Sequence, residues 1–210
     1  MRHLKKLSAV IAAAAALAAL CGCEDGGGGG GDDVGDNNPD LVICVGDSIT
    51  QGYACDGAPY PSQLAAMSGK QVRNLGIGGA RAGTGASKIS SQLACKPGYV
   101  CILYGANDAI NGGSSGNVKE NIRAIIAACK RNQSIPIVAT TPPMTSWHKI
   151  FDGDARSINE AIRAVANEEG VTLVDLYKAF GDGEGYLVSD GLHPNAAGAE
   201  LIARKFNGAL

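Results

Sequence analysis

The stretch VICVGDSITQGY, residues 42–53, decides the fold of this chain. A run of apolar, mostly β-branched residues ends at Gly46-Asp47-Ser48, and Gly52 follows four residues after the serine. A strand that ends in a small turn and a serine can present a hydroxyl group at the edge of a sheet. The same pattern is also an ordinary way to begin a helix, because serine is a preferred N-cap residue. The rest of the sequence has to distinguish these two interpretations.

From residue 41 onward, short β-rich runs alternate with amphipathic helical patterns. In residues 117–132, for example, the apolar positions Ile122, Ile125, Ile126 and Cys129 recur at helical spacing. Near-continuous apolar strands that alternate with such helices indicate a parallel sheet covered on both faces. We therefore predict a single α/β domain, a three-layer sandwich whose parallel strands are Leu41–Val45, Gln71–Asn74, Tyr99–Tyr104, Ile135–Thr140 and Val171–Leu173.

The first residues, 1–23, have the pattern of an export signal. Basic residues are followed by an apolar run from Leu7 to Leu20, too short to span a bilayer comfortably as a mature helix. The segment ends in Leu-Cys-Gly-Cys, which resembles a bacterial lipobox, although Cys21 stands where a smaller or aliphatic residue is usual. We expect lipid attachment at Cys23. A plain secretory signal cleaved nearby is the alternative.

Residues 24–39 are almost entirely glycine and acidic residues with little apolar content. Such a composition cannot form a core, so we predict a disordered tether followed by a catalytic domain over residues 40–210. Without the signal the net charge is about −5, and no basic stripe remains. We therefore expect no nucleic-acid partner, membrane association through the lipid anchor only, a monomer, and a location in the bacterial cell envelope.

Five cysteines remain after the signal, an odd number that leaves at least one unpaired in a monomer. Cys44 and Cys101 fall in predicted strands and Cys129 on an apolar helix face, so we predict buried free thiols. Cys55 and Cys95 would pair only if their loops meet, and the predicted topology separates them. Neither a C-x-x-C motif nor a cluster of histidine and cysteine occurs in this region, so we expect no metal.

Polar and small residues follow the predicted strands where a parallel sheet binds its ligands, at the carboxyl ends. The first three strands lead into residues 46–50 (GDSIT), 74–83 (NLGIGGARAG) and 104–113 (YGANDAINGG). A fourth segment, residues 188–198 (VSDGLHPNAAG), precedes the last helix. We expect all four segments to converge on one rim of the sheet.

These segments contain the groups that acyl transfer requires. A serine nucleophile needs a base within hydrogen-bond reach, and the base needs a carboxylate that holds its tautomer. Ser48 supplies the hydroxyl, and His193 is the histidine on the rim, with Asp190 three residues before it. Donors to the oxyanion would be the backbone amides of Ser48 and Gly79 and the side-chain amide of Asn107.

The blocks GDSIT, NLGIGG, GAND and DGLHPN, in this order, resemble the SGNH or GDSL-type serine ester hydrolase family, and the resemblance runs from about Val42 to Gly198. It implies a flavodoxin-like α/β/α sandwich that needs no cofactor. It also implies that Asp47 is mostly structural. The implied site comprises the nucleophile Ser48, the base His193, the orienting Asp190, and an oxyanion hole of Ser48, Gly79 and Asn107.

Each assignment has a structural alternative. Ser48 and His193 could serve as helix caps, Gly79 as a tight-turn glycine and Asn107 as part of an Asx turn. The choice of Gly79 over its neighbour Gly78 rests on counting from the second strand.

Residues 112–116 (GGSSG) match the G-x-S-x-G nucleophile motif. No strand directly precedes them, so we exclude Ser114. Arg81 breaks the dinucleotide-binding glycine pattern in the second loop.

The predicted activity is cleavage of carboxylic esters through an acyl-enzyme on Ser48. The loop at residues 142–154 contributes Trp147 and His148 as candidate substrate-wall residues, and Tyr53 is a candidate on the opposite side. Few aromatic residues and modest loops favour an open, shallow cleft for short acyl esters, such as acetyl groups on cell-envelope glycans. The alternatives are a glycan O-acetyltransferase, a lysophospholipase or thioesterase with the same site, and an inactive binding lipoprotein.

Overall fold

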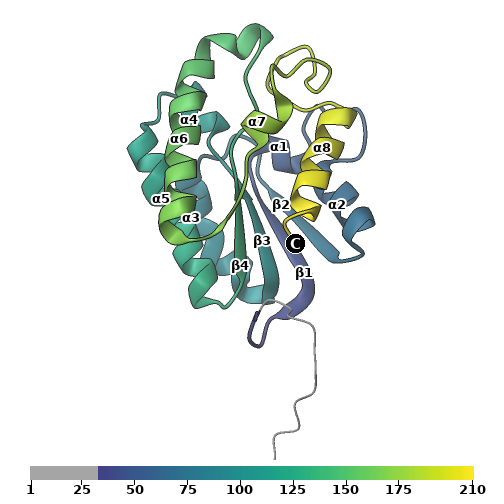
Figure 1. The fold of residues 1–210 in the computed structure, drawn as a ribbon, viewed down its shortest axis with the longest axis vertical. Helices are drawn as coiled ribbons and strands as arrows, with labels where there is room; N and C mark the ends of the chain where they lie inside the picture. Colours follow the sequence, from purple (N-terminus) through teal and green to yellow (C-terminus); the bar gives the residue numbers. More distant parts are fainter. Residues whose placement is uncertain (1–32) are drawn as a thin grey trace, which may run out of the picture. The chain divides into compact units, whose positions relative to one another are not determined.

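The computed structural model describes residues 33–210, which form a five-stranded, wholly parallel sheet in the order β2-β1-β3-β4-β5 (Figure 1). This confirms the predicted fold class. The predicted export signal, the lipidation at Cys23 and most of the predicted tether lie outside the described residues. The strands are β1 (Asn38–Gly46), β2 (Gln71–Gly76), β3 (Pro97–Leu103), β4 (Ile135–Ala139) and β5 (Thr172–Val174).

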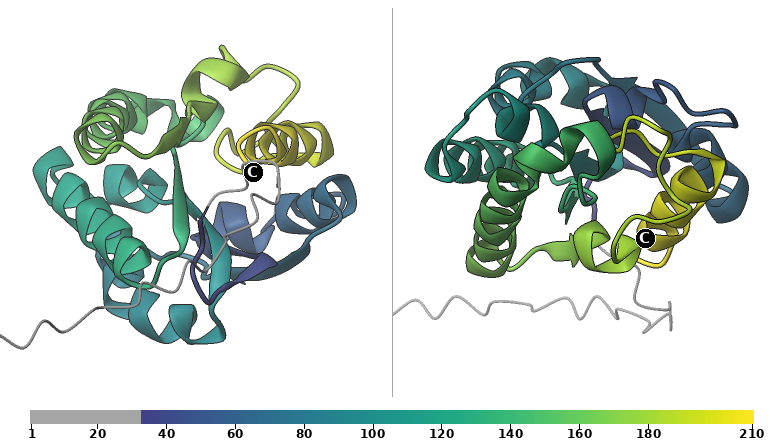
Figure 2. Two further views of the ribbon diagram at one scale, coloured as in Figure 1. Left: turned by 60° about the horizontal axis from the view of Figure 1, so that its bottom comes forward. Right: turned by 90° about the horizontal axis from the view of Figure 1, so that it is seen from above.

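Helices cover both faces of this sheet, as the end-on views of Figure 2 show. One face carries α3 (Ala82–Gln92), α4 (Ala106–Ile110), α5 (Ser115–Arg131) and α6 (Asp152–Glu169). The other carries α2 (Tyr60–Ser68), α7 (Leu176–Phe180) and α8 (Ala196–Asn207), while the single turn α1 (Ser48–Gln51) follows β1 directly. Two 3₁₀ helices complete the secondary structure, η1 (Leu93–Cys95) and η2 (Ser146–Phe151). Because both faces are covered, β3 is buried along its whole length.

The predicted helical patterns correspond to real apolar faces. In α5 the predicted positions are all buried, and the side chain of Ser114 caps the helix by accepting a hydrogen bond from the amide of Asn117. Ser114 is thus a helix cap that follows α4 and a turn, not a strand, which agrees with its exclusion as a nucleophile. None of the helices within residues 33–210 combines the length and the apolar character needed to cross a bilayer.

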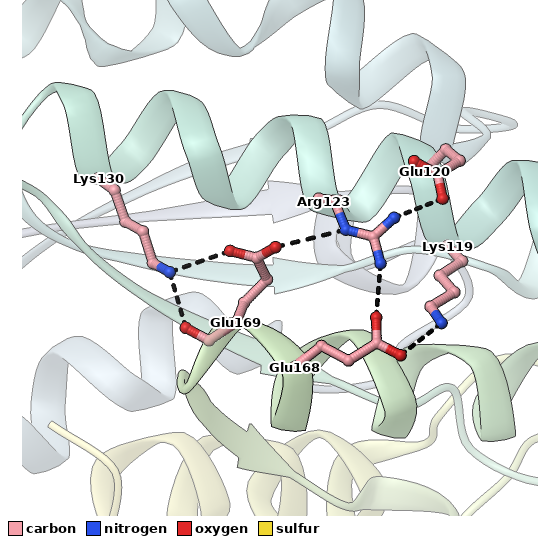
Figure 3. A network of polar contacts seen from close by, with 6 residues as sticks. All are labelled: Lys119, Glu120, Arg123, Lys130, Glu168 and Glu169. Carbon is pink, nitrogen blue, oxygen red and sulfur yellow. Dashed lines mark hydrogen bonds and ion pairs between the residues drawn. The ribbon is translucent and has the colours of Figure 1, made fainter.

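Ion pairs join α5 to α6 along their exposed sides (Figure 3). Arg123 contacts Glu120 on its own helix and both Glu168 and Glu169 at the end of α6. Lys119 and Lys130 extend the network to Glu168 and Glu169, at 2.6 and 3.1 Å between nitrogen and oxygen. Exposed pairs of this kind are weakened by water and salt, so we expect the network to contribute little to the stability of the fold.

The ordered domain begins earlier than the predicted boundary at Asp40. Val34 and Asn37 are buried, and β1 already starts at Asn38. The side-chain amide of Asn37 donates a hydrogen bond of 2.6 Å to the backbone carbonyl of Asn132. Apolar burial at Val34 and this hydrogen bond fix the segment, so the tether predicted over residues 24–39 is too long at its carboxyl end.

All five cysteines within residues 33–210 have free thiols. Cys44, Cys101 and Cys129 are fully buried, as predicted. Cys44 and Cys101 lie opposite each other on the neighbouring strands β1 and β3. Burial raises the pKa of the Cys101 thiol well above its ordinary value and that of Cys129 to about 12. These thiols therefore behave as small apolar core residues.

Replacement of Gly85 by alanine should destabilise the domain, because a Cβ atom there would lie 2.6 Å from Cε2 of the buried Tyr104 ring. We expect a loss of about 1–3 kcal/mol in the free energy of unfolding, measured by urea denaturation. Gly83→Ala on the same helix is the matched control, since its Cβ would lie 3.5 Å from the nearest atom. Equal stability of the two variants would contradict this packing.

Candidate active site

The carboxyl ends of three strands lie at one level. Gly46, the last residue of β1, pairs with Gly76 of β2 on one side and with Leu103 of β3 on the other. The chain runs from β1 to β2 on one side and then returns to β3 on the other side of β1, so the strand order reverses between β1 and β3. Open parallel sheets bind their ligands at such a switch point. The loops after β1 and β3 deliver Ser48 and Asn107 to it.

Ser48 is the first residue of α1, and Asp47 rather than Ser48 caps this helix. The Asp47 carboxylate accepts a hydrogen bond of 2.9 Å from the amide of Ile49. The turn lies directly against the end of β2, since a Cβ atom on Gly76 would be only 2.3 Å from the amide nitrogen of Gln51. Glycine at position 76 therefore lets α1 approach the sheet, and the Ser48 hydroxyl is not used for capping.

His193 connects Ser48 with Asp190. Its Nε2 lies 3.0 Å from Oγ of Ser48, and its Nδ1 lies 2.6 Å from Oδ2 of Asp190. Because an ionised carboxylate only accepts hydrogen bonds, Nδ1 carries the proton, and Nε2 of the neutral ring is free to accept the proton of the serine hydroxyl. The three predicted residues thus form a continuous hydrogen-bonded chain from carboxylate to hydroxyl.

The Asp190 carboxylate is stabilised in its ionised form. Partial burial raises its pKa, but hydrogen bonds from the His193 ring and from the backbone amides of His193 and Leu192 outweigh burial and bring the pKa below its ordinary value. Asp190 therefore stays charged at neutral pH, which suits a group that holds the proton on Nδ1 of His193.

The turn at residues 188–193, here called the histidine turn, packs against the loop after β4. Gly191 has a positive φ of 73°, and a Cβ atom there would lie 2.1 Å from the carbonyl oxygen of Thr145. The amide of Thr145 donates a hydrogen bond of 2.8 Å to the carbonyl of Gly191. Only glycine satisfies both this backbone conformation and this close approach.

Asn107 lies beside the serine on the side of β3. Its Nδ2 donates a hydrogen bond of 3.1 Å to the carbonyl of Ala80 and lies 3.4 Å from Oδ2 of Asp47. The first contact fixes the amide in place, while the second is long and weak. Both Nδ2 hydrogens thus have partners, and an oxyanion near Ser48 would have to take over the hydrogen of the longer bond to Asp47.

Two buried carboxyl groups lie behind the serine and the asparagine, Asp47 and Asp108, at 1 % and 6 % exposure. Burial raises the pKa of Asp47 to about 7, although the amide of Ile49 donates to it, and nearby Asp108 raises the pKa further. Burial also raises the pKa of Asp108, whose Oδ2 accepts a hydrogen bond of 3.0 Å from the amide of Ala82. The sequence shows both acids in the GDS and GAND blocks but not their burial.

A shallow cleft of about 260 Å³ opens at the serine and is lined by Ser48, Gln51, Tyr53, Gly78, Gly79 and His193. A hollow beside β5 is larger, at about 550 Å³, so chemistry rather than size identifies the site. Both candidate glycines reach the cleft, as does Tyr53, whose ring meets the His193 ring edge-on at 4.8 Å between centroids. Gln51 was not among the predicted site residues, although a residue three positions after Ser48 in a helix lies on the same face.

The other two wall candidates are not among the residues that line this cleft. Trp147 on η2 is 84 % exposed. His148 is half-buried, and its Nδ1 donates a hydrogen bond of 2.8 Å to the backbone carbonyl of Asp190. Within residues 33–210 no cluster of three histidine, cysteine, aspartate or glutamate side chains could hold a metal ion.

Comparison with known proteins gives a consistent result. The sequence model of the GDSL-like lipase/acylhydrolase family matches residues 44–201. An acetylxylan esterase from Xylanibacter ruminicola is 25 % identical in an alignment of length 205, and the match covers 80 % of this chain and 42 % of that protein. This chain thus spans less than half the length of that relative.

Solved structures share the fold. A lipolytic protein of the G-D-S-L family from Desulfitobacterium hafniense superposes with a TM-score of 0.72 at 27 % identity, over 81 % of this chain and 99 % of that chain. An acetylxylan esterase from Geobacillus stearothermophilus superposes with a TM-score of 0.71 over 82 % of this chain and 94 % of that chain. At 19 % identity the second likeness concerns the fold alone.

Asp47→Asn should change how the stability of the domain depends on pH. The folded-state pKa of Asp47 is raised from 3.8 to about 7, so its neutral form stabilises the wild type fully below pH 3.8, and this contribution is lost as the pH rises through about 7. Asparagine stays neutral, so the variant should gain up to about 4 kcal/mol relative to wild type between pH 4 and pH 8. Urea unfolding at pH 4, 6 and 8 measures this difference. Parallel stability curves would mean that Asp47 ionises with an ordinary pKa.

Proposed function

This chain belongs to the GDSL-like lipase/acylhydrolase family and is an ester hydrolase, and from this premise we propose that it removes short acyl groups, acetyl above all, from glycans through an acyl-enzyme on Ser48. The observation that carries the proposal is the unbroken chain of hydrogen bonds from Asp190 through His193 to Ser48, at 2.6 and 3.0 Å, which ends in the cleft. We further propose that the enzyme works in the cell envelope, anchored by a lipid on Cys23.

The proposed mechanism has two acyl-transfer steps. His193 Nε2 takes the hydroxyl proton as Ser48 Oγ attacks the ester carbonyl, and the resulting oxyanion is held by the amides of Ser48 and Gly79 and by Nδ2 of Asn107. The tetrahedral intermediate collapses to an acyl-enzyme as His193 returns the proton to the departing alcohol oxygen. A water molecule, deprotonated by His193, then attacks the acyl-enzyme. His193 returns this proton to Ser48 Oγ as the bond from the acyl carbon to Oγ breaks and the carboxylic acid leaves. Throughout, charged Asp190 stabilises the imidazolium form of His193.

The dimensions of the cleft support a short acyl group. At about 260 Å³ it is smaller than the pockets that enclose drug-sized ligands, which are about 300–1,000 Å³. A long acyl chain would leave most of its apolar surface in water and gain little binding energy. Lysophospholipase or long-chain thioesterase activity is therefore the less favoured use of this site.

The surroundings of the cleft support a sugar as the alcohol component. Tyr53 is 62 % exposed and lies against His193, so one face of its ring can stack on a sugar at the reacting centre. Trp147 and Ile150, three residues apart on η2, are also highly exposed and offer further apolar surface. The similarity to the acetylxylan esterase from Xylanibacter ruminicola is consistent with this choice of substrate class.

The test is hydrolysis of p-nitrophenyl acetate, butyrate and octanoate by a domain that begins at Asp33, with Ser48→Ala alongside. We expect acetate to be cleaved fastest, activity to fall steeply toward octanoate, and the variant to be inactive. Release of acetate from acetylated xylan would then identify the glycan substrate.

The other outcomes separate the alternatives. Preference for octanoate would favour the lipase-like enzyme, and faster acetyl transfer to an added sugar than to water would favour the O-acetyltransferase. Activity that survives in Ser48→Ala, or no activity on any ester, would contradict the proposed role of Ser48, and the latter result would favour a binding lipoprotein.

Asn107→Ala should lower kcat for p-nitrophenyl acetate by about 10²-fold or more, because one oxyanion donor contributes on the order of 3 kcal/mol. Asn117→Ala, which removes an exposed amide on α5 outside the cleft, is the matched control and should retain wild-type turnover. Turnover of Asn107→Ala within threefold of wild type would mean that Asn107 is not an oxyanion donor.

A further inference from the structure

His148 contacts the histidine turn from outside the cleft. Its Nδ1 lies 2.8 Å from the backbone carbonyl oxygen of Asp190. A carbonyl only accepts hydrogen bonds, so Nδ1 must carry the proton and donate. The same Asp190 holds the His193 ring through its carboxylate at 2.6 Å. One residue thus receives a hydrogen bond from His148 on its backbone and holds the ring of His193 with its side chain.

The loop that carries His148 is itself fixed. The carboxylate of Asp152, which is 4 % exposed, accepts a hydrogen bond of 3.0 Å from the amide of Met144. The hydroxyl of Tyr177 donates to the same carboxylate at 3.2 Å, and the amide of His148 donates to the carbonyl of Thr145 at 2.9 Å. His148 therefore projects from a fixed segment, so its hydrogen bond can fix the position of the Asp190 carbonyl.

The histidine turn is held in part by its own hydrogen bonds, since the amides of Val188 and Gly191 donate to the carbonyls of His193 and Val188, both at 2.9 Å. Its central residue is Gly191, which has the most conformational freedom of any residue type when unrestrained. Two further hydrogen bonds join the turn to the anchored loop: one from the amide of Thr145 to the carbonyl of Gly191, and one from His148 to the carbonyl of Asp190. The first belongs to the backbone, so the second is the one that depends on the identity of a side chain.

We infer that His148 is a positioning residue, which aims the Asp190 carboxylate at His193 by holding the Asp190 carbonyl. The inference rests on the proposed function in one respect, since a gain in turnover requires that the Ser48–His193–Asp190 chain be catalytic. The position of the Asp190 carboxylate does not depend on that function. His148 neither lines the cleft nor lies within hydrogen-bond distance of Ser48 in the described structure.

The kinetic test compares three replacements of His148 with one control replacement on α5. Asparagine places an amide N–H close to the position of imidazole Nδ1, whereas glutamine places its amide near Nε2. We expect His148→Ala to lower kcat for p-nitrophenyl acetate roughly tenfold, about the effect of one hydrogen bond, with KM within twofold of wild type. His148→Asn should restore most of the turnover and His148→Gln should not. Asn117→Ala, which changes an exposed residue of α5 outside the cleft, should match wild type on this ester.

A second readout does not require turnover. The His193 Nδ1 proton, held in a short hydrogen bond to Asp190, should give a far-downfield line in the ¹H NMR spectrum, assigned by its loss in His193→Ala. We expect this line to move upfield or broaden in His148→Ala and to return in His148→Asn. If wild type cleaves no ester while the line follows this pattern, the proposed function fails and the positioning role stands.

Two results would overturn the inference. One is a His148→Ala variant with wild-type kcat and an unchanged downfield line. The other is an equal loss of turnover in the asparagine and glutamine variants, with the same downfield line in both spectra. This result would show that a hydrogen-bond donor at the position of His148 Nδ1 does not position Asp190. Should the alanine variant fail to fold, the comparison of asparagine with glutamine decides the matter by itself.

Discussion

The site depends on the alignment of three parallel strands at their carboxyl ends. β1 is hydrogen-bonded on both sides, and its last residue, Gly46, pairs with Gly76 and Leu103. A slip of one residue in either pairing would exchange the side chains of the two covered faces and disrupt the packing of both helix layers, so core packing fixes the register. With the register fixed, the loops after β1, β2 and β3 leave the sheet together. The positions of the serine, the glycines and the asparagine therefore depend on how the strands pack in the core, away from the reacting groups.

Two carboxyl groups near the serine have opposite environments. Hydrogen bonds to Asp190 keep its pKa low and its charge available to His193, whereas burial raises the pKa of Asp47 to about 7. Asp47 caps α1 with one oxygen and lies near Asn107 with the other, so it connects the nucleophile turn with the oxyanion side. With a pKa of about 7, Asp47 is protonated in a large share of molecules at neutral pH, and the protonated form places no negative charge beside a developing oxyanion.

The sequence predicted those features that depend on local pattern. Apolar periodicity located all five strands, and four motif blocks predicted Ser48, Asn107, Asp190 and His193, which the structure brings to one rim. Features that depend on packing between distant segments were not predictable. The end of the tether was placed too late because the burial of Val34 depends on the folded domain. His148 was expected at the substrate wall, but its bond to the Asp190 carbonyl joins loops 42 residues apart. The pKa of Asp47 likewise depends on burial that no motif encodes.

The central claim is that His193 activates the hydroxyl of Ser48 as a nucleophile. The most direct measurement is labelling of the folded domain with a fluorophosphonate, followed by mass spectrometry of its peptides. Serine Oγ attacks phosphorus and fluoride departs, so the label records the nucleophile itself. The account predicts one adduct on Ser48 in wild type, none on Ser114, and a rate reduced by orders of magnitude in His193→Ala. A folded protein that stays unlabelled, or that carries the adduct elsewhere, would contradict it.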